Sequence, residues 1–180
     1  MLRLFRSRPE FRRLFLAHTI SRAGDAFNTV ALVVLVFNLS GSGLGVAGVV
    51  MFEVLPVFLL GPVAGVAADR LARRRLMIGA DLARAAVAAV LVLVPGSVGV
   101  AYAVAFGLSS GAVMFGPAAS SLLPEVVGEA DVVAANSALW SSAVVAQVVL
   151  APTAGVVIAV FGIEVAFAVN AISFVVAALC

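Results

Sequence analysis

Residues Gly61 to Arg75 read GPVAGVAADRLARRR, and this stretch decides the fold. Its first eight residues are apolar or small, Asp69 follows, and four arginines then occur within six positions. A sharp change from apolar to basic sequence is typical of a membrane helix that ends at the cytoplasmic surface, where basic residues are retained. We therefore expect a membrane span to end at Ala68 and the arginines to form a cytoplasmic link.

The composition of the 180-residue chain supports this interpretation. Apolar residues make up 64% and charged residues 11%, whereas soluble domains are roughly 45–50% apolar and about 25% charged. A soluble fold of this size cannot hide so much apolar surface from water. With one cysteine, Cys180, and one histidine, His18, the chain has no disulfide framework and little means to build a metal centre. We expect an all-α membrane protein without a cofactor.

Six segments are candidate membrane spans. A helix that crosses the hydrocarbon core needs about 20 mostly apolar residues. Short links with turn-forming residues separate the segments, so neighbouring helices run antiparallel. The last segment ends without a polar anchor, which predicts that the chain is part of a longer protein. The predicted spans are Arg13–Asn38, Leu44–Ala68, Leu76–Val94, Val98–Leu122, Val132–Val160 and Ile163–Cys180.

The basic residues predict how these spans lie in the membrane. All eleven are arginine, and none follows Arg84. Nine of them stand at the start of the first span or in the link after the second, and Arg22 and Arg84 lie within spans, while the links after the first, third and fifth spans have none. The positive-inside rule therefore puts the amino terminus in the cytoplasm of a multi-pass cell-membrane protein. Charge confined to short links reflects topology, so nucleic acid is not an expected partner.

Three charged residues lie deep in the predicted spans: Arg22, Asp25 and Glu53. A charge at the centre of a bilayer costs about 2.5–3.5 kcal/mol on insertion scales, so it must pair with another charge or face water. At a rise of about 1.5 Å per residue, Asp25 and Glu53 lie at nearly the same depth. One polar helix face of the first span consists of His18, Arg22, Asp25 and Thr29.

Two interpretations of these charges stay open. In the first, Arg22 and Asp25 form an ion pair that only fixes helix packing. In the second, Arg22, Asp25 and Glu53 form a substrate or proton site, because Glu53 has no basic neighbour in its own span and such a carboxyl group can carry a proton. Asp81 and Arg84 form a further pair nearer the cytoplasmic end of the third span, and we expect that pair to be structural.

Other polar side chains share helix faces in the last two spans. Asn136, Trp140 and Gln147 lie on one face of the fifth span, and Asn170 and Ser173 lie together on the sixth. They either line the same cavity or form hydrogen bonds between helices. Both alternatives are compatible with the sequence.

Two motifs match sites of soluble enzymes. Gly43–Gly48 fits G-x-G-x-x-G after a strand-like run, which would make a dinucleotide loop with Asp69 on the ribose. Gly107–Gly111 fits G-x-S-x-G, which would make Ser109 the nucleophile of an intramembrane hydrolase with His18 as the only available histidine. Small residues in membrane helices more often serve close packing. We expect neither activity.

The link after the second span carries the most specific motif of the chain. It resembles the major facilitator superfamily signature G-x-x-x-D-[RK]-x-G-R-[RK], with Ala72 in place of the second glycine. The resemblance covers all 180 residues, as the amino-terminal six-helix half of a twelve-helix transporter. It implies a cytoplasmic gate whose partner helix lies in a carboxyl-terminal half that the chain lacks. The matching residues are Gly65, Asp69, Arg70, Arg73 and Arg74.

Shorter matches resemble the branch of enterobactin exporters and macrolide efflux proteins. This resemblance implies a secondary transporter in the lipid bilayer that exports a small drug-like or siderophore-like molecule, with protons as the candidate coupling ion. The alternatives are a transport-incompetent fragment and a half-size structural partner. The matching residues are Arg22–Asp25, Leu55–Pro56, Phe167, Asn170–Ala171 and Ser173–Phe174.

A short internal sequence repeat predicts how the six spans are related. Gly61–Val66 reads GPVAGV near the inner end of the second span, and Ala151–Val156 reads APTAGV near the outer end of the fifth. Corresponding positions on opposite sides of the membrane are what an inverted repeat gives. We expect residues 1–180 to form one six-helix bundle, built as a 3+3 inverted repeat from residues 13–95 and 98–180.

Overall fold

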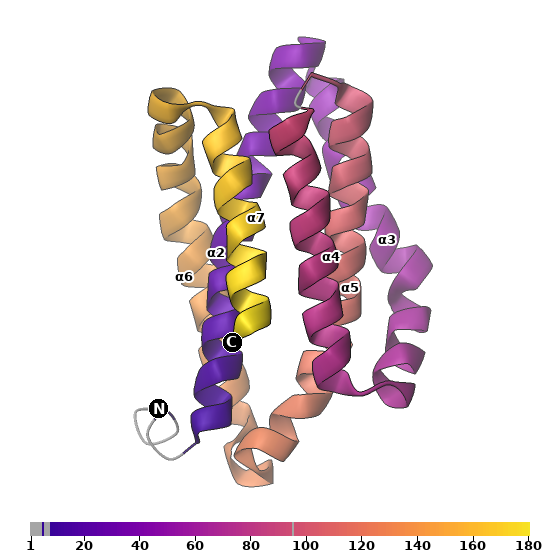
Figure 1. Cartoon of the computed structure of the whole chain (residues 1–180), viewed down its shortest axis with the longest axis vertical. Coiled ribbons are helices and arrows are strands. Elements are labelled where there is room, and N and C mark those ends of the chain that lie inside the picture. The colour runs from indigo at the N-terminus through magenta and orange to yellow at the C-terminus, as the bar shows by residue number, and fades with distance from the viewer. Residues whose placement is uncertain (1–4, 6–7, 95) are drawn as a thin grey trace.

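The computed structural model describes residue 5 and residues 8–94 and 96–180. Arg3 and Arg6, which contribute to the predicted orientation, and Pro95 lie outside the described residues. The described chain forms a bundle of long helices that run up and down along one axis (Figure 1). The helices are α2 (Pro9–Ser40), α3 (Gly43–Arg70), α4 (Arg73–Leu93), α5 (Val98–Val127), α6 (Val132–Phe161) and α7 (Ile163–Leu179), with a 3-10 turn η1 (Glu129–Asp131) before α6.

The helices agree with the predicted spans to within a few residues at most ends, and the largest differences are at the start of α2 and the end of α5. Five of them are long and apolar enough to cross a membrane. The last, α7, is apolar but has 17 residues, whereas about 20 are needed to cross the hydrocarbon core without adjustment. An all-helical fold with several membrane-length helices is thus confirmed. The prediction of six spans in a 3+3 repeat stays a prediction.

The helix ends are set by local chemistry. Gly41 adopts a left-handed conformation with φ 62°, and its N–H donates to Phe37 O at 2.8 Å, which ends α2. The Ser42 side chain then accepts a hydrogen bond from Leu44 N at 3.2 Å and caps the start of α3. This tight turn makes α2 and α3 antiparallel, as the short links predict.

The core of the bundle lies around α2, α4, α5 and α7. Helix α2 packs against α5, α6 and α7, α4 packs against α5 and α7, and α3 packs mainly against α5. One cluster of buried apolar residues includes Leu32, Leu91 and Phe167, and a second, nearer the arginine-rich end, includes Phe11 and Phe115. These two clusters hold the helices whose polar residues form the site.

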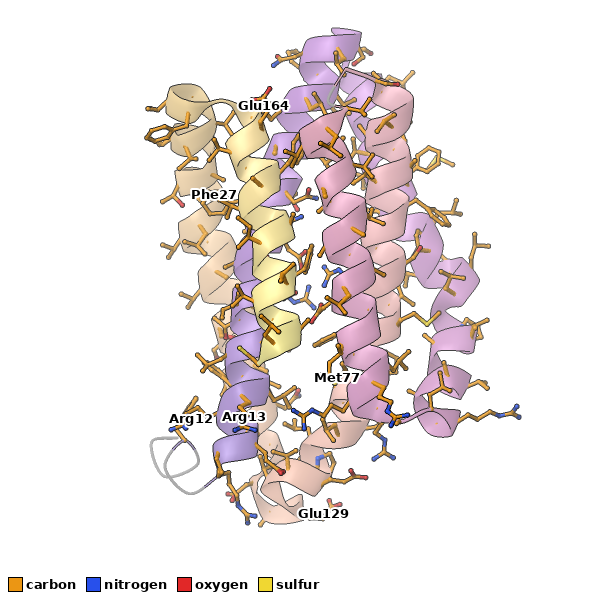
Figure 2. All side chains as sticks on the ribbon, in the orientation of Figure 1. Arg12, Arg13, Phe27, Met77, Glu129 and Glu164 are labelled. Carbon is orange, nitrogen blue, oxygen red and sulfur yellow. The ribbon has the colours of Figure 1, made fainter. Side chains whose placement is uncertain are left out.

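The two outlying helices, α3 and α6, keep most of their surface outside this core. Only four of the 28 residues of α3 and five of the 30 residues of α6 are buried, compared with eleven of 32 in α2. Orange carbon sticks accordingly project from both helices over most of their length (Figure 2). The figure also shows Arg12, Arg13 and Glu129 at one end of the bundle and Glu164 at the other.

The glycine motifs serve helix packing. The segment before Gly43 belongs to helix α2, so the strand that a dinucleotide loop requires does not exist there. Tyr102 on α5 lies against Gly48 and donates to Gly45 O at 2.8 Å. Ser109 on α5 donates to the backbone carbonyl oxygen of Glu53 on α3. Gly107 and Gly111 of the second motif lie against Val87 and Arg84 of α4, so the two motifs bring α5 close to α3 and to α4.

Candidate functional site

The centre of the site is Arg84, a buried arginine on α4 with 4% of its surface exposed. Its Nη2 donates to Asp25 Oδ1 at 2.6 Å, and its Nη1 donates to Ser21 Oγ at 3.2 Å. Both partners belong to α2. Because an unpaired charge inside a membrane protein is costly, these two hydrogen bonds hold α4 against α2 in the middle of the bundle.

Two further groups surround the guanidinium. Asp81 lies one helical turn away on α4, with Oδ1 at 3.6 Å from Arg84 Nη1. The Phe174 ring of α7 lies 4.0 Å from the guanidinium carbon, which is the geometry of a cation–π contact. Three helices, α2, α4 and α7, therefore meet at one positive charge. We call Ser21, Asp25, Asp81, Arg84 and Phe174 the Arg84 cluster.

The sequence prediction missed the main partner of Asp25. It paired Asp25 with Arg22 and treated Asp81 and Arg84 as a separate pair, whereas Arg84 makes the closer contact with Asp25 and Arg22 Nη1 stays 3.7 Å from Asp25 Oδ2. The depth of each residue along its helix could have indicated this pair. Arg84 lies eleven residues past Arg73, or about 17 Å along its helix, and Asp25 lies at about 18 Å in the first span.

Glu53, the third predicted residue, is half-buried on α3 and forms no ion pair among the described residues. The structure brings Asp25 near Arg22, and it adds Arg84 as the residue that neutralises Asp25.

A groove of about 480 Å³ lies between α2, α5 and α6. It contains the polar face predicted for the fifth span together with two residues of the polar face of α2, and Arg22 enters it with 48% of its side chain exposed. One of the two alternatives for Asn136, Trp140 and Gln147 is therefore confirmed, since they line a common cavity. The polar and aromatic lining residues are His18, Arg22, Phe115, Ser120, Asn136, Trp140 and Gln147.

The polar residues of α7 have a different location. Asn170 and Ser173 are buried, with 0% and 8% of their surface exposed, and both lie against Gly24 of α2. Ser173 Oγ donates to Asn170 O at 2.7 Å. These two residues therefore belong to the contact between α2 and α7 and not to the groove.

The cytoplasmic motif is at the arginine-rich end of the bundle. Asp69 and Arg70 are exposed at the end of α3, and Arg73 forms an ion pair with Glu125 of α5. Arg74 lines a separate cavity of about 230 Å³ between α2, α4, α5 and α7. Gly61 and Gly65 form a G-x-x-x-G pattern, which predicts a close helix contact, but nothing described lies within 4 Å of the place a Cβ would take at Gly65, so that contact is not made within the described residues.

Comparison with known proteins gives consistent matches. The transmembrane secretion effector family, MFS_3, matches residues 5–180. The uncharacterized MFS-type transporter YfiS of Bacillus subtilis (strain 168) is 32% identical over 182 residues, which cover 98% of the chain and 42% of that protein. The uncharacterized MFS-type transporter Rv0037c of Mycobacterium tuberculosis is 34% identical over 149 residues, covering 79% of the chain and 34% of that protein. The chain thus spans well under half the length of these relatives.

Two solved structures share the fold. The POT family transporter PepTSo matches 96% of the chain and 36% of its own length, with a TM-score of 0.79 and 17% identity. An auto-inhibited POT family peptide transporter matches 94% of the chain and 35% of its own length, with a TM-score of 0.71 and 16% identity. At this identity the likeness concerns the fold alone.

Proposed function

Because the chain belongs to the transmembrane secretion effector family of the major facilitator superfamily, we propose that it forms the amino-terminal half of a secondary transporter. Its family and its relatives make it a multi-pass membrane transport protein and not an enzyme. The proposed activity is efflux of a small molecule across the cell membrane by alternating access, in which two halves rock around a site near the midplane.

The observation that carries this proposal is the set of charges deep in the bundle. Arg22 is half-exposed in the groove, and Asp25 connects it to the Arg84 cluster. Charged residues at such depth are expensive and mark substrate or ion pathways by default. A purely structural pair would not need to expose a guanidinium in a groove lined by Asn136 and Gln147. We assign Arg22, Asp25 and Glu53 to the substrate or proton site.

The uncovered faces of α3 and α6 support a second half. Both helices present large apolar side chains, among them Phe58 at 76%, Val133 at 79% and Trp140 at 71% exposure. Lipid accepts such side chains, but the groove beside Trp140 also contains polar residues, and polar groups are costly against hydrocarbon. A second six-helix half packed on these faces would close the groove into a cavity.

Proton coupling follows from the position of Asp25. As a carboxylate it neutralises Arg84 at 2.6 Å. A proton on Asp25 would remove that attraction and leave Arg84 with Asp81 alone, which changes the contact between α2 and α4. Glu53, which forms no ion pair among the described residues, is the second candidate proton carrier. Binding and release of a proton would thus weaken and restore the contact between α2 and α4 next to the groove.

The cytoplasmic motif takes the role of a gate in this proposal. Asp69 lies at the carboxyl end of α3, where the helix dipole disfavours a negative charge, and it is exposed. Its partner would be a helix of the second half. Arg73, paired with Glu125, would fix the link between α3 and α4. The amino terminus and this link are proposed to face the cytoplasm.

Transport by variants of the complete transporter tests the proposal. Export of a panel of fluorescent amphiphiles is measured from cells that make the transporter of which this chain is the amino-terminal half. Asp25→Asn and Glu53→Gln are expected to abolish or uncouple export. Ser110→Ala is the control, because its hydroxyl bonds to the Phe106 carbonyl of its own helix, and its export should equal that of wild type. Wild-type rates in both carboxyl variants would overturn the proposed function.

A further inference from the structure

We propose that the groove between α2, α5 and α6 binds amphipathic organic anions, with Arg22 as the residue that takes the anionic group. The inference rests on the proposed function and names the substrate class of the same site. Such a ligand has an apolar or aromatic body and one carboxylate, sulfonate or phosphate group.

The charge of Arg22 is available because another arginine satisfies its neighbour. Asp25 has its Oδ1 at 2.6 Å from Arg84, within hydrogen-bonding distance, whereas its Oδ2 is 3.7 Å from Arg22 Nη1, beyond that distance. Among the described residues Arg22 makes no hydrogen bond. A guanidinium offers five N–H donors in a planar fork that fits carboxylate and phosphate groups. Those donors lie in the groove, where a ligand can use them.

The rest of the lining sets the sign of the preferred charge. Within the described residues Arg22 is the one charged residue of the groove, and no carboxylate lines it. The nearest carboxylate, Asp25, does not line the groove and bonds more closely to Arg84 than to Arg22, so an organic cation would meet the arginine, whereas an anion would meet a donor fork. The lining therefore discriminates against cations.

The other walls fit an apolar body. Phe115, Leu139 and Val144 contribute apolar surface, and Trp140 offers an aromatic face with 71% of its surface exposed. The amides of Asn136 and Gln147 supply hydrogen bonds on the same side. A volume of about 480 Å³ falls in the range of roughly 300–1,000 Å³ that is typical of small-molecule sites. One aromatic ring system with an acidic group would occupy it.

Trp140 makes this proposal directly measurable. It is the single tryptophan of the chain and lines the groove that contains Arg22. The chain is placed in phosphatidylcholine liposomes, which add no other tryptophan and whose zwitterionic lipid supplies no anionic headgroup to compete. Energy transfer from Trp140 is then titrated with dansylglycine, which carries a carboxylate, and with dansylamide, its neutral counterpart. We expect dansylglycine to bind with a Kd at least about tenfold lower than that of dansylamide, a difference of about 1.4 kcal/mol.

Variants at Arg22 assign the difference to this side chain. Arg22→Gln is expected to raise the Kd of dansylglycine about tenfold, to that of dansylamide, and to leave the Kd of dansylamide unchanged. Arg22→Lys keeps the charge and should retain most of the preference. Arg12→Gln is the matched control, since it removes an exposed arginine of the same helix outside the groove, and both Kd values should stay at wild-type level.

The outcomes separate this inference from the proposed function. Equal Kd values for the two dansyl compounds, or a preference that survives Arg22→Gln, overturn the inference and leave the groove as a ligand site. Energy transfer from neither compound overturns the inference and also counts against transport through this groove. If Arg22→Gln does not fold, the preference of the wild-type chain and of Arg22→Lys still decides between these outcomes.

Discussion

Arg84 shows how a single residue determines the local arrangement of three helices. It is buried on α4, bonds to Asp25 on α2 and lies against the Phe174 ring of α7. The sequence identifies the charges of the site, because a charge in an apolar span stands out. It does not reveal which charges pair, because pairing across helices depends on the rotation and depth of each helix. Only the rise per residue hints that Arg84 and Asp25 meet.

Removal of this arginine should destabilise the bundle. Arg84→Met keeps much of the length and packing of the side chain but leaves Asp81 without a cation and Asp25 with only the more distant Arg22, so we expect a loss of about 3–5 kcal/mol in the free energy of unfolding. Thermal and SDS denaturation of purified protein measure it. Arg12→Gln, an exposed control, should change stability by less than about 0.5 kcal/mol.

A double variant tests the assignment of Asp25 as the main partner. If Asp25 and Arg84 form a direct ion pair, Asp25→Asn should lower the cost of Arg84→Met, because the half-buried negative charge of Asp25 is removed together with its cation. Additive costs of the two substitutions would contradict a direct ion pair.

At the scale of elements, the glycines decide which helices come close, but their spacing does not identify the partner. The G-x-x-x-G pattern of Gly61 and Gly65 predicts a tight contact, yet nothing described lies within 4 Å of a Cβ at either position. The tight contacts are made instead at Gly24, Gly48 and Gly111. Helix periodicity indicates the face on which a glycine lies, whereas the neighbour depends on the tertiary packing. Most helix ends, by contrast, follow from local apolar runs and turn residues.

The contact between α2 and α7 should depend on Gly24. A Cβ there would overlap Ser173 Oγ and lie 2.8 Å from Asn170 Oδ1, so Gly24→Ala should cost about 1–3 kcal/mol through overpacking. Gly155→Ala is the matched control, because nothing described lies within 4 Å of its Cβ position and alanine favours a helix by about 1 kcal/mol.

Chemical denaturation of both glycine variants in the same detergent gives the comparison. Addition of Ser173→Ala to Gly24→Ala should recover part of the loss, because it removes the overlapping oxygen. A Gly24→Ala variant as stable as wild type would contradict the close approach of α2 and α7.

At the scale of the whole molecule, composition and arginine distribution predict the membrane fold, and the long apolar helices and the family match agree with that prediction. Sequence patterns do not show that α3 and α6 stay largely uncovered, because both are as apolar as a buried helix would be. The groove was similarly predictable in part. Helix periodicity predicts that Asn136, Trp140 and Gln147 share one face. That Arg22 lines the same groove depends on the packing of α2 against α6, which the sequence does not reveal.

Cysteine labelling tests the predicted orientation. In a background with Cys180→Ser, which removes the single native cysteine, Ser42→Cys and Ala72→Cys place a thiol in the first and second links. A membrane-impermeant maleimide added to intact cells should label Ser42→Cys and should label Ala72→Cys only after permeabilisation. The reverse pattern would place the amino terminus outside the cell.

The most direct test of the central claim is to block the groove during transport. In a complete transporter from which every native cysteine is removed, Gln147→Cys places a thiol in the groove, and Ile172→Cys places one on the exposed side of α7. A small charged methanethiosulfonate is added and export is measured. Modification should stop export by Gln147→Cys and leave export by Ile172→Cys unchanged. Full export by modified Gln147→Cys would contradict the claim that the substrate passes through this groove.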